Sequence, residues 1–238
     1  QLLRMLPRRT LPVALAVVLA LISTLRAQDN PTYHTPSPAL AAIVDAPLTP
    51  LVSVSPDRKR LLLLERPALP PVAELAEPEL RLAGLRLNPA TNGPSRDSYY
   101  TWVVVKTLAD ASEKNLAGLP AKARLTDLAW SRDSRHVLMT VTVGEGLQLW
   151  VADVATATAR KVTDRALNGT VDSPAWLDDR TIIASLVPAA RGAAPLPPAV
   201  PSGPTVQENL GGKRPARTYP DMLASAYDEA LFEHYATS

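Results

Sequence analysis

The sequence predicts an all-β fold made of repeated pairs of short strands, with proline-rich insertions and a short C-terminal helix. Three observations predict it. Short apolar segments joined by tight polar turns recur along the chain, three of these turns carry an aspartate, and the 24 prolines fall mainly between the segments. Proline breaks long helices and stiffens turns, so we expect many short elements.

Residues 1–27 are predicted to be a signal peptide. Arg4, Arg8 and Arg9 precede an apolar run over residues 11–22, and a small residue closes the segment. This is the layout of a secretory signal, so we expect an exported protein, periplasmic or extracellular. A retained membrane anchor is the alternative, although the run is shorter than the roughly 20 apolar residues that a spanning helix needs. We expect membrane contact only if this leader is not cleaved.

The leader also accounts for the basic charge of the chain. The net charge is +2, from 25 Lys and Arg against 23 Asp and Glu, and four of the arginines lie in residues 1–27. Residues 28–238 therefore carry 21 minus 23, or −2. Nucleic-acid binding needs a basic face or stripe, and the cluster at residues 58–60 is better explained as a solvated hairpin tip, so we expect no nucleic-acid partner. The absence of cysteine excludes disulfides, thiolate metal sites and cysteine nucleophiles.

Residues 28–50 are predicted to form an extended arm with one or two helical turns at residues 39–44. Residues 51–238 follow a different pattern, that of paired strands. The predicted hairpins join residues 51–55 to 60–65, 125–130 to 135–141 and, more weakly, 173–177 to 181–186. Their turn aspartates Asp57, Asp133 and Asp179 align, at separations of 76 and 46 residues. Further strands are expected at residues 99–105, 147–154 and 159–163.

Four short strands about every 45 residues, with a tryptophan before the turn, are typical of propeller blades. An isolated four-stranded sheet cannot bury both of its faces, so neighbouring blades stack on one another. We therefore predict an incomplete β-propeller of about three blades over residues 51–238. Another antiparallel sandwich with similar hairpins is the alternative.

Two insertions and a helix complete the prediction. Residues 67–84 are expected to form a proline-stiffened loop with a short helix, and residues 187–217 a second proline-rich excursion. A capping box at Thr218 and Asp221 is then predicted to open a helix. An apolar stripe follows at Leu223, Tyr227, Leu231 and Tyr235. Packing of this stripe on the sheet is favoured over a groove for a partner.

The search for catalytic residues identifies none. No Gly-x-Ser-x-Gly elbow occurs, and His34, His136 and His234 are read as ordinary surface or core histidines. No metal-binding, phosphate-binding or dinucleotide motif occurs, so no cofactor-binding or metal-ligating residue is named and no cofactor is expected.

Three weaker signals remain. Turn chemistry accounts for Asp172, Asp178 and Asp179 without a cation. Asn168-Gly169-Thr170 matches a glycosylation sequon. Arg81, Arg86 and Arg96 in the first insertion could present charge to acidic peptides, but solvated loop arginines are far commoner.

Several longer segments resemble one family. They are residues 45–47, 66–76, 79–86, 150–153, 200–204 and 227–238. Over about residues 35–238 the chain resembles the N-terminal part of prolyl-oligopeptidase-type serine peptidases, in the branch of the glutamyl endopeptidases. The resemblance implies a β-propeller that restricts peptide access to a C-terminal α/β-hydrolase domain carrying Ser, Asp and His, and cleavage after glutamate. That hydrolase domain is absent from this chain, so no family catalytic residue can be carried over.

Three hypotheses follow. The first is the N-terminal propeller portion of a secreted serine endopeptidase, inactive by itself, whose partner is a peptide or protein substrate. The second is a stand-alone periplasmic propeller that acts as a binding module, and the third is a membrane-anchored scaffold. Propellers need at least about four blades, and about three fit here, so the first is favoured. We expect the gene to continue past Ser238 and to encode the Gly-x-Ser-x-Gly elbow.

Overall fold

The computed structural model describes residues 34–144, 146–200, 211 and 221–238. The chain divides into two compact units, residues 1–46 and 47–238. In the first unit, helix α2 (Pro38–Val44) lies where the helical turns were predicted, with Ser37 as its N-cap. The predicted signal peptide, residues 1–27, lies outside the described residues. None of the helices in the described ranges is long and apolar enough to cross a membrane.

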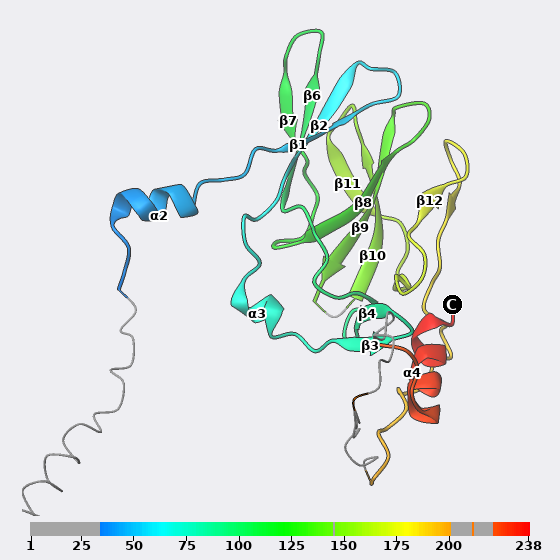
Figure 1. Ribbon diagram of the computed structural model, residues 1–238. Helices are drawn as coiled ribbons and strands as arrows, with labels where there is room; N and C mark the ends of the chain where they lie inside the picture. The colour runs from blue at the N-terminus through cyan, green and yellow to red at the C-terminus, as the bar shows by residue number, and fades with distance from the viewer. Residues whose placement is uncertain (1–33, 145, 201–210, 212–220) are drawn as a thin grey trace, which may run out of the picture. The chain divides into compact units, whose positions relative to one another are not determined.

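The second unit is mostly β-structure, which confirms the all-β prediction at this level (Figure 1). Two four-stranded antiparallel sheets have the same order along the chain. The first contains β1 (Leu51–Val54), β2 (Arg60–Glu65), β6 (Trp102–Thr107) and β7 (Glu113–Asn115). The second contains β8 (Arg124–Trp130), β9 (His136–Val143), β10 (Gly146–Asp153) and β11 (Thr158–Lys161). The weaker third hairpin is present as β12 (Ala175–Trp176) and β13 (Ile182–Ile183).

The second sheet is covered on both faces. Alternate residues of β9, including Val137 and Met139, contribute to a core shared with Leu62 and Val105 of the first sheet. Leu138 points the opposite way, into a core to which the third hairpin contributes. Five consecutive residues of β9 are consequently buried, because the two sides of a strand each face a different neighbour. None of the four sheets in the described part closes on itself.

The first insertion is more ordered than predicted. It contains the expected short helix, α3 (Val72–Leu75), and also a small sheet that the sequence analysis missed. The strands of this sheet are β3 (Leu80–Leu82), β4 (Leu85–Asn88) and β5 (Gly93–Pro94). Ala83 and Gly84 join β3 to β4 with φ of 51° and 81°, the left-handed backbone that a two-residue hairpin turn requires.

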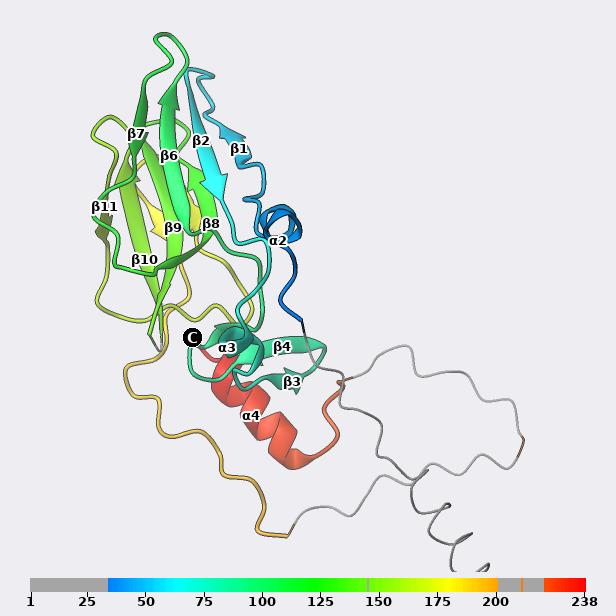
Figure 2. The ribbon, with the colours of Figure 1, turned by 90° about the vertical axis from the view of Figure 1, so that its left-hand side faces the viewer.

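The C-terminal helix α4 (Ala226–Ala236) packs on this small sheet, as Figures 1 and 2 both show. Leu231 and Tyr235 are buried against Leu82 and Leu87, so the predicted apolar stripe contacts a sheet. The predicted helix start was wrong.

The N-cap of α4 is Ser225, whose side chain accepts the Asp228 N–H at 3.1 Å. The Asp228 carboxylate in turn accepts the Ala224 N–H at 3.0 Å. This reciprocal capping starts the helix after Ser225. Asp221, assigned to the capping box, lies in a bend with φ of 66°, and Thr218 lies outside the described residues.

Two hydrogen bonds recur between successive repeats. Trp130 Nε1 donates to Ser53 Oγ, and Trp176 Nε1 donates to the carbonyl oxygen of Ala129, both at 3.0 Å. Ser53 and Ala129 occupy the same place in their repeats, two residues before the serines that open the turns, Ser55 and Ser131. Each tryptophan thus contacts the equivalent position of the preceding repeat.

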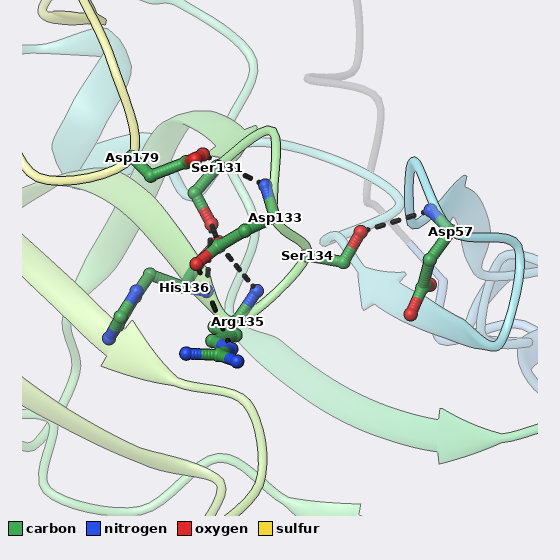
Figure 3. A network of polar contacts seen from close by, with 7 residues as sticks. All are labelled: Asp57, Ser131, Asp133, Ser134, Arg135, His136 and Asp179. Carbon is green, nitrogen blue, oxygen red and sulfur yellow. Dashed lines mark hydrogen bonds and ion pairs between the residues drawn. The ribbon is translucent and has the colours of Figure 1, made fainter.

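The turns contact one another in the same manner (Figure 3). The Asp57 N–H donates to Ser134 Oγ at 3.0 Å, and the Asp133 N–H donates to Asp179 Oδ1 at 2.8 Å. In each turn, one aspartate carboxylate also accepts the N–H two residues further on: Asp57, Asp133 and Asp178 do so.

The predicted alignment of Asp179 with Asp57 and Asp133 was therefore wrong by one residue. Asp178 is the aspartate that closes its own turn, and Asp179 takes the place of Ser134 as the acceptor for the preceding turn. Two adjacent aspartates cannot be distinguished by spacing alone.

Candidate functional site

A polar cleft of about 90 Å³ lies between the first insertion and the second sheet. It has room for several water molecules or a small side chain. Its lining comes from α3, from the stretch that follows β5, from strands β8, β9 and β10, and from the segment before β12. A wider hollow of about 410 Å³ adjoins it and shares Glu74, Arg96, Asp97 and Tyr99. These two hollows are the candidate binding region of the second unit.

One wall of the cleft is a paired acidic and basic network. Glu74 on α3 is only 6% exposed, and its Oε2 accepts a hydrogen bond from the Tyr99 hydroxyl at 2.9 Å. Arg124 Nη1 lies 3.7 Å from that oxygen and 3.5 Å from Glu77 Oε1, and its guanidinium stands 5.7 Å from the centre of the Tyr99 ring. Asn88 completes the network by donating to Glu77 Oε2 at 2.5 Å.

Within this network the buried carboxylate of Glu74 is paired and hydrogen-bonded. A buried carboxylate is tolerated only when it is paired and hydrogen-bonded, and here one guanidinium and one phenol satisfy Glu74. Burial, and then the hydrogen bond to Glu74, raise the pKa of Tyr99 above its ordinary value, so the phenol stays protonated. The network therefore fixes α3 against β8 and leaves no strong base free in this wall.

Asp127 lies at the mouth of the cleft on an irregular part of β8. The register with β9 shifts between Thr126 and Ala129, and Asp127 has φ of 52°. Its carboxylate accepts a hydrogen bond from Ser173 Oγ at 2.7 Å, across to the third repeat. Bulges often redirect a side chain next to a binding site, and a positive φ in a non-glycine residue stores strain.

Thr140 supplies the unsatisfied group of the cleft. It is 2% exposed, it lines the cleft, and its Oγ1 has no hydrogen-bond partner in the described part of the chain. Buried hydroxyls almost always find a partner, so this atom marks the point where a water molecule or a ligand group is expected. The sequence carried a signal for it, because Thr140 is the one polar residue in the buried run of β9.

The structure does not bring the three histidines into a catalytic arrangement. His34 lies in the first unit. His136 is on β9, with its ring centroid 6.4 Å from that of Trp176, and His234 is on α4, edge-on to Tyr235 at 4.9 Å. Among the described residues, no serine donates to a histidine ring nitrogen. Burial, and then the nearby Arg191, lower the pKa of His234, so it is neutral at pH 7.

The aspartates considered as cation ligands and the glycosylation sequon at residues 168–170 have structural explanations. Over the described ranges, no group of three or more His, Cys, Asp or Glu side chains could hold a metal ion. Asn168 of the sequon is 3% exposed, and its side chain donates to the carbonyl oxygens of Tyr235 and Thr237 at 3.0 and 2.9 Å. This asparagine ties the end of α4 to the sheets and is inaccessible to a glycosylating enzyme in the folded chain.

The structure does bring together the three arginines of the first insertion. Arg81, Arg86 and Arg96 all form ion pairs with Glu79, at 3.0, 4.0 and 3.8 Å. Sequence reasoning treated them as separate solvated side chains because the missed hairpin is what places Arg81 opposite Arg86. The alternation of leucine and arginine on both sides of Ala83-Gly84 was the available signal.

Comparison with known proteins finds similarity to two curated plant proteins. No family model matches it. It is 40% identical over 220 residues to a probable glutamyl endopeptidase, chloroplastic, of Oryza sativa subsp. japonica, a match that covers 87% of this chain and 24% of that protein. A protein of the same name from Arabidopsis thaliana is 38% identical over 219 residues, covering 87% and 23%. The chain is thus similar in sequence to proteins named glutamyl endopeptidase.

This finding confirms the resemblance recognised in the sequence. The glutamyl endopeptidase-like chain spans about a quarter of the length of the curated relatives that it matches. Solved structures give weaker matches. AtxE2 isopeptidase is 18% identical with a TM-score of 0.34, covering 58% of this chain and 21% of that one. A putative dipeptidyl aminopeptidase IV from Bacteroides ovatus is 14% identical with a TM-score of 0.34, covering 56% and 20%. Similarity at this level does not establish a common fold.

Proposed function

We propose that the chain is the N-terminal propeller portion of a serine endopeptidase of the prolyl-oligopeptidase type, which limits peptide access to a hydrolase domain outside this chain. The observation that carries the proposal is the identity of 38–40% with proteins named glutamyl endopeptidases, extending over 87% of the chain. Peptide or protein is accordingly the proposed substrate of the whole enzyme, with cleavage after glutamate.

The contacts between repeats support the propeller part of the proposal. The tryptophan bond and the turn bond each occur at both junctions, between equivalent positions. A propeller is built by repeating one contact between neighbouring blades. A two-sheet sandwich has no reason to stack a third hairpin on the outer face of the second sheet in the same manner.

The chain itself is proposed to be inactive. The cleft is small, the buried Glu74 in its wall is engaged by Arg124 and Tyr99, and the described residues assemble no nucleophile with a general base. Its proposed role is to shape and filter the path of the peptide toward the reactive serine, with Thr140 and Asp127 among the groups that contact the peptide or its water.

The experiment compares two proteins. One is the 238-residue chain, and the other includes the coding sequence that follows Ser238. Both are assayed on a fluorogenic peptide cleaved after glutamate and are treated with a fluorophosphonate probe that labels reactive serines. We expect cleavage and labelling in the longer protein only. Turnover by the purified short chain would contradict the assignment, and a stop codon directly after Ser238 would favour the binding module instead.

Export is a separate proposal. We propose that residues 1–27 direct secretion and are removed, on the basis of their positive, apolar and small-residue layout. N-terminal sequencing of the protein recovered from the periplasm or medium is expected to begin at Gln28. A protein that retains Arg4 to Arg9 in the membrane fraction would support the anchor instead.

A further inference from the structure

The small sheet of the first insertion concentrates positive charge around one inward-facing carboxylate. The Glu79 side chain is 6% exposed, whereas those of Arg81, Arg86 and Arg96 are 52%, 55% and 40% exposed. Arg81 Nε donates to Glu79 Oε1 at 3.0 Å. The carboxylate thus lies underneath and the guanidinium groups face outward.

The charges of this cluster do not balance. Arg81 and Arg86 are direct cross-strand partners in the β3–β4 pair, and like charges directly opposite each other destabilise an antiparallel sheet. One carboxylate offsets one of three guanidinium groups, which leaves +2. The hydrogen bond from Arg81 holds the pKa of Glu79 below its ordinary value, so this balance persists at neutral pH. A hairpin selected only for stability would need neither the second nor the third arginine.

The unused donors define what the cluster can bind. Each guanidinium carries five N–H donors in a planar fork that matches a carboxylate. Contacts among the described residues use few of them: Arg81 donates to Glu79, Arg96 Nη2 donates to the carbonyl oxygen of Leu75 at 3.0 Å, and Arg86 approaches Glu79 only at 4.0 Å. Several donors on a preorganised surface therefore remain directed at solvent.

The position of Arg96 connects this cluster to the candidate cleft. Arg96 lines both the cleft of about 90 Å³ and the adjoining hollow of about 410 Å³, which Arg66 also lines. Arg96 thus belongs both to the cluster and to the lining of these hollows. A ligand that extends from the cluster toward the hollows, as a peptide can, is therefore favoured over an isolated small anion.

We propose that Arg81, Arg86 and Arg96 form a subsite that binds an acidic stretch of a peptide. The choice of a peptide rests on the proposed function. A nucleic acid is disfavoured because residues 28–238 carry a net charge of −2 and the cluster has no basic stripe leading away from it.

The test measures binding without catalysis, so it stands even if the longer protein shows no peptidase activity. The 238-residue chain is titrated into a short fluorescein-labelled peptide with consecutive glutamates, and fluorescence anisotropy is followed. The same peptide with glutamines is the control ligand. We expect salt-sensitive binding of the glutamate peptide only. Equal binding of both peptides would refute an acidic subsite.

Variants locate the site. Arg81→Gln and Arg86→Gln are each expected to weaken binding about tenfold, the usual loss for a charge-assisted hydrogen bond. Arg58→Gln and Arg132→Gln remove the same charge from exposed turns and are expected to change binding less than about twofold. If all four variants weaken binding equally, only the overall charge acts and the proposal fails.

The variant Glu79→Gln distinguishes a binding role of the arginine cluster from a purely structural role. If Glu79 competes with the ligand for the guanidinium groups, its neutralisation is expected to tighten binding several-fold even though the hairpin loses its internal ion pairs. A structural role alone predicts weaker or unchanged binding.

The double variant Arg81→Lys/Arg86→Lys keeps the charge but loses the planar fork of donors. Its affinity for the glutamate peptide is expected to lie between those of the unmodified chain and the glutamine variants. Thermal unfolding of each variant checks folding, and tighter binding of a single-stranded oligonucleotide than of the peptide would overturn the assignment to a peptide.

Discussion

The two four-stranded sheets have the same strand order but very different surroundings. In the second sheet, β9 ends at Val143 and β10 begins at Gly146, and both strands are buried along most of their length. In the first, β2 reaches β6 only after the long insertion at residues 66–101, and β1 leaves Leu51, Val52 and Val54 exposed. The sheet pairing therefore tolerates a large insertion, because the entropy of closing a loop grows only slowly with its length.

The difference in burial between the two sheets follows from the position of each sheet in the series of repeats. The second sheet has a neighbour on each face, whereas the first is covered by the second on one face only. Under the propeller proposal, the exposed valines of β1, Val52 and Val54, belong to an interface that a further repeat would cover.

The largest expected effect on stability comes from truncating a buried side chain of the second sheet, which has a neighbouring repeat on each face. Leu138 is 0% exposed, and Leu138→Ala is expected to reduce the free energy of unfolding by about 2–5 kcal/mol. Val52→Ala, on the outer face of β1 opposite to Leu62 and Leu64, is the control and is expected to change it by less than about 0.5 kcal/mol. Urea unfolding measures both.

The same pair sharpens the propeller proposal. In a longer protein whose further repeats cover the outer face of β1, Val52→Ala is expected to become costly and to move toward the effect of Leu138→Ala. If Val52→Ala stays neutral there, the outer face of β1 is a true free face and the series of repeats does not continue over it.

The next largest effect is at the connection between the two sheets. Gly118, between β7 and β8, has φ of 87°, and a Cβ added there would lie 2.3 Å from the carbonyl oxygen of Ala159. Gly118→Ala therefore combines left-handed strain with a backbone clash and is expected to cost about 2–4 kcal/mol. Gly144→Ala has the strain (φ 55°) but meets no atom within 4 Å, so about 1 kcal/mol is expected. Equal melting temperatures for the two variants would show that the sheets can separate at this contact.

A smaller effect tests whether the two junctions are equivalent. Trp130→Phe and Trp176→Phe each remove one indole hydrogen bond to the preceding repeat and are each expected to cost about 1 kcal/mol. Trp150→Phe is the control, because its indole bonds to Gln148 within its own strand. If Trp130→Phe lowers the stability and Trp176→Phe does not, the third hairpin is only loosely attached. The argument that one contact is repeated between successive repeats would then weaken.

The sequence predicted the elements in which one local signal dominates. Alternating or continuous apolar runs bounded by polar turns identified β1, β2, β8, β9 and β10, because strand burial follows directly from that pattern. It missed the β3–β4 hairpin because prolines on both sides suggested a loop. It misplaced the start of α4 because two Ser/Thr-x-x-Asp patterns lie seven residues apart, and the one at Ser225 caps the helix.

The site was less predictable than the fold. Arg124, Glu74 and Tyr99 come from three separate parts of the chain, and no spacing rule relates them. The strain at Asp127 is a property of the β8–β9 register and not of its own sequence neighbourhood. What the sequence supplied was the composition of the insertion, whereas the arrangement of its charges depends on the hairpin.

The smallest expected effect concerns acid and the turns. Hydrogen bonds lower the pKa of three turn aspartates below its ordinary value: from Ser55 and then Lys59 for Asp57, from Ser131 and then Arg135 for Asp133, and from Arg180 and then Thr181 for Asp178. A carboxyl with a lowered pKa in the folded state stabilises fully above its unfolded value of about 4 and loses this contribution as the pH falls through the folded value. Stability is therefore expected to decline below about pH 4.

Asp133→Asn is expected to flatten this decline, because the amide cannot titrate, and to lower the melting temperature slightly at pH 7. Asp164 is the control. It is also a carboxylate with a lowered pKa, from its hydrogen bond to Lys161, but it closes no turn between repeats. Asp164→Asn is expected to leave the melting temperature at pH 7 nearly unchanged, because an exposed ion pair contributes little. If Asp133→Asn behaved in the same way, the turn carboxylates would be incidental and the serine hydroxyls alone would hold the repeats in register.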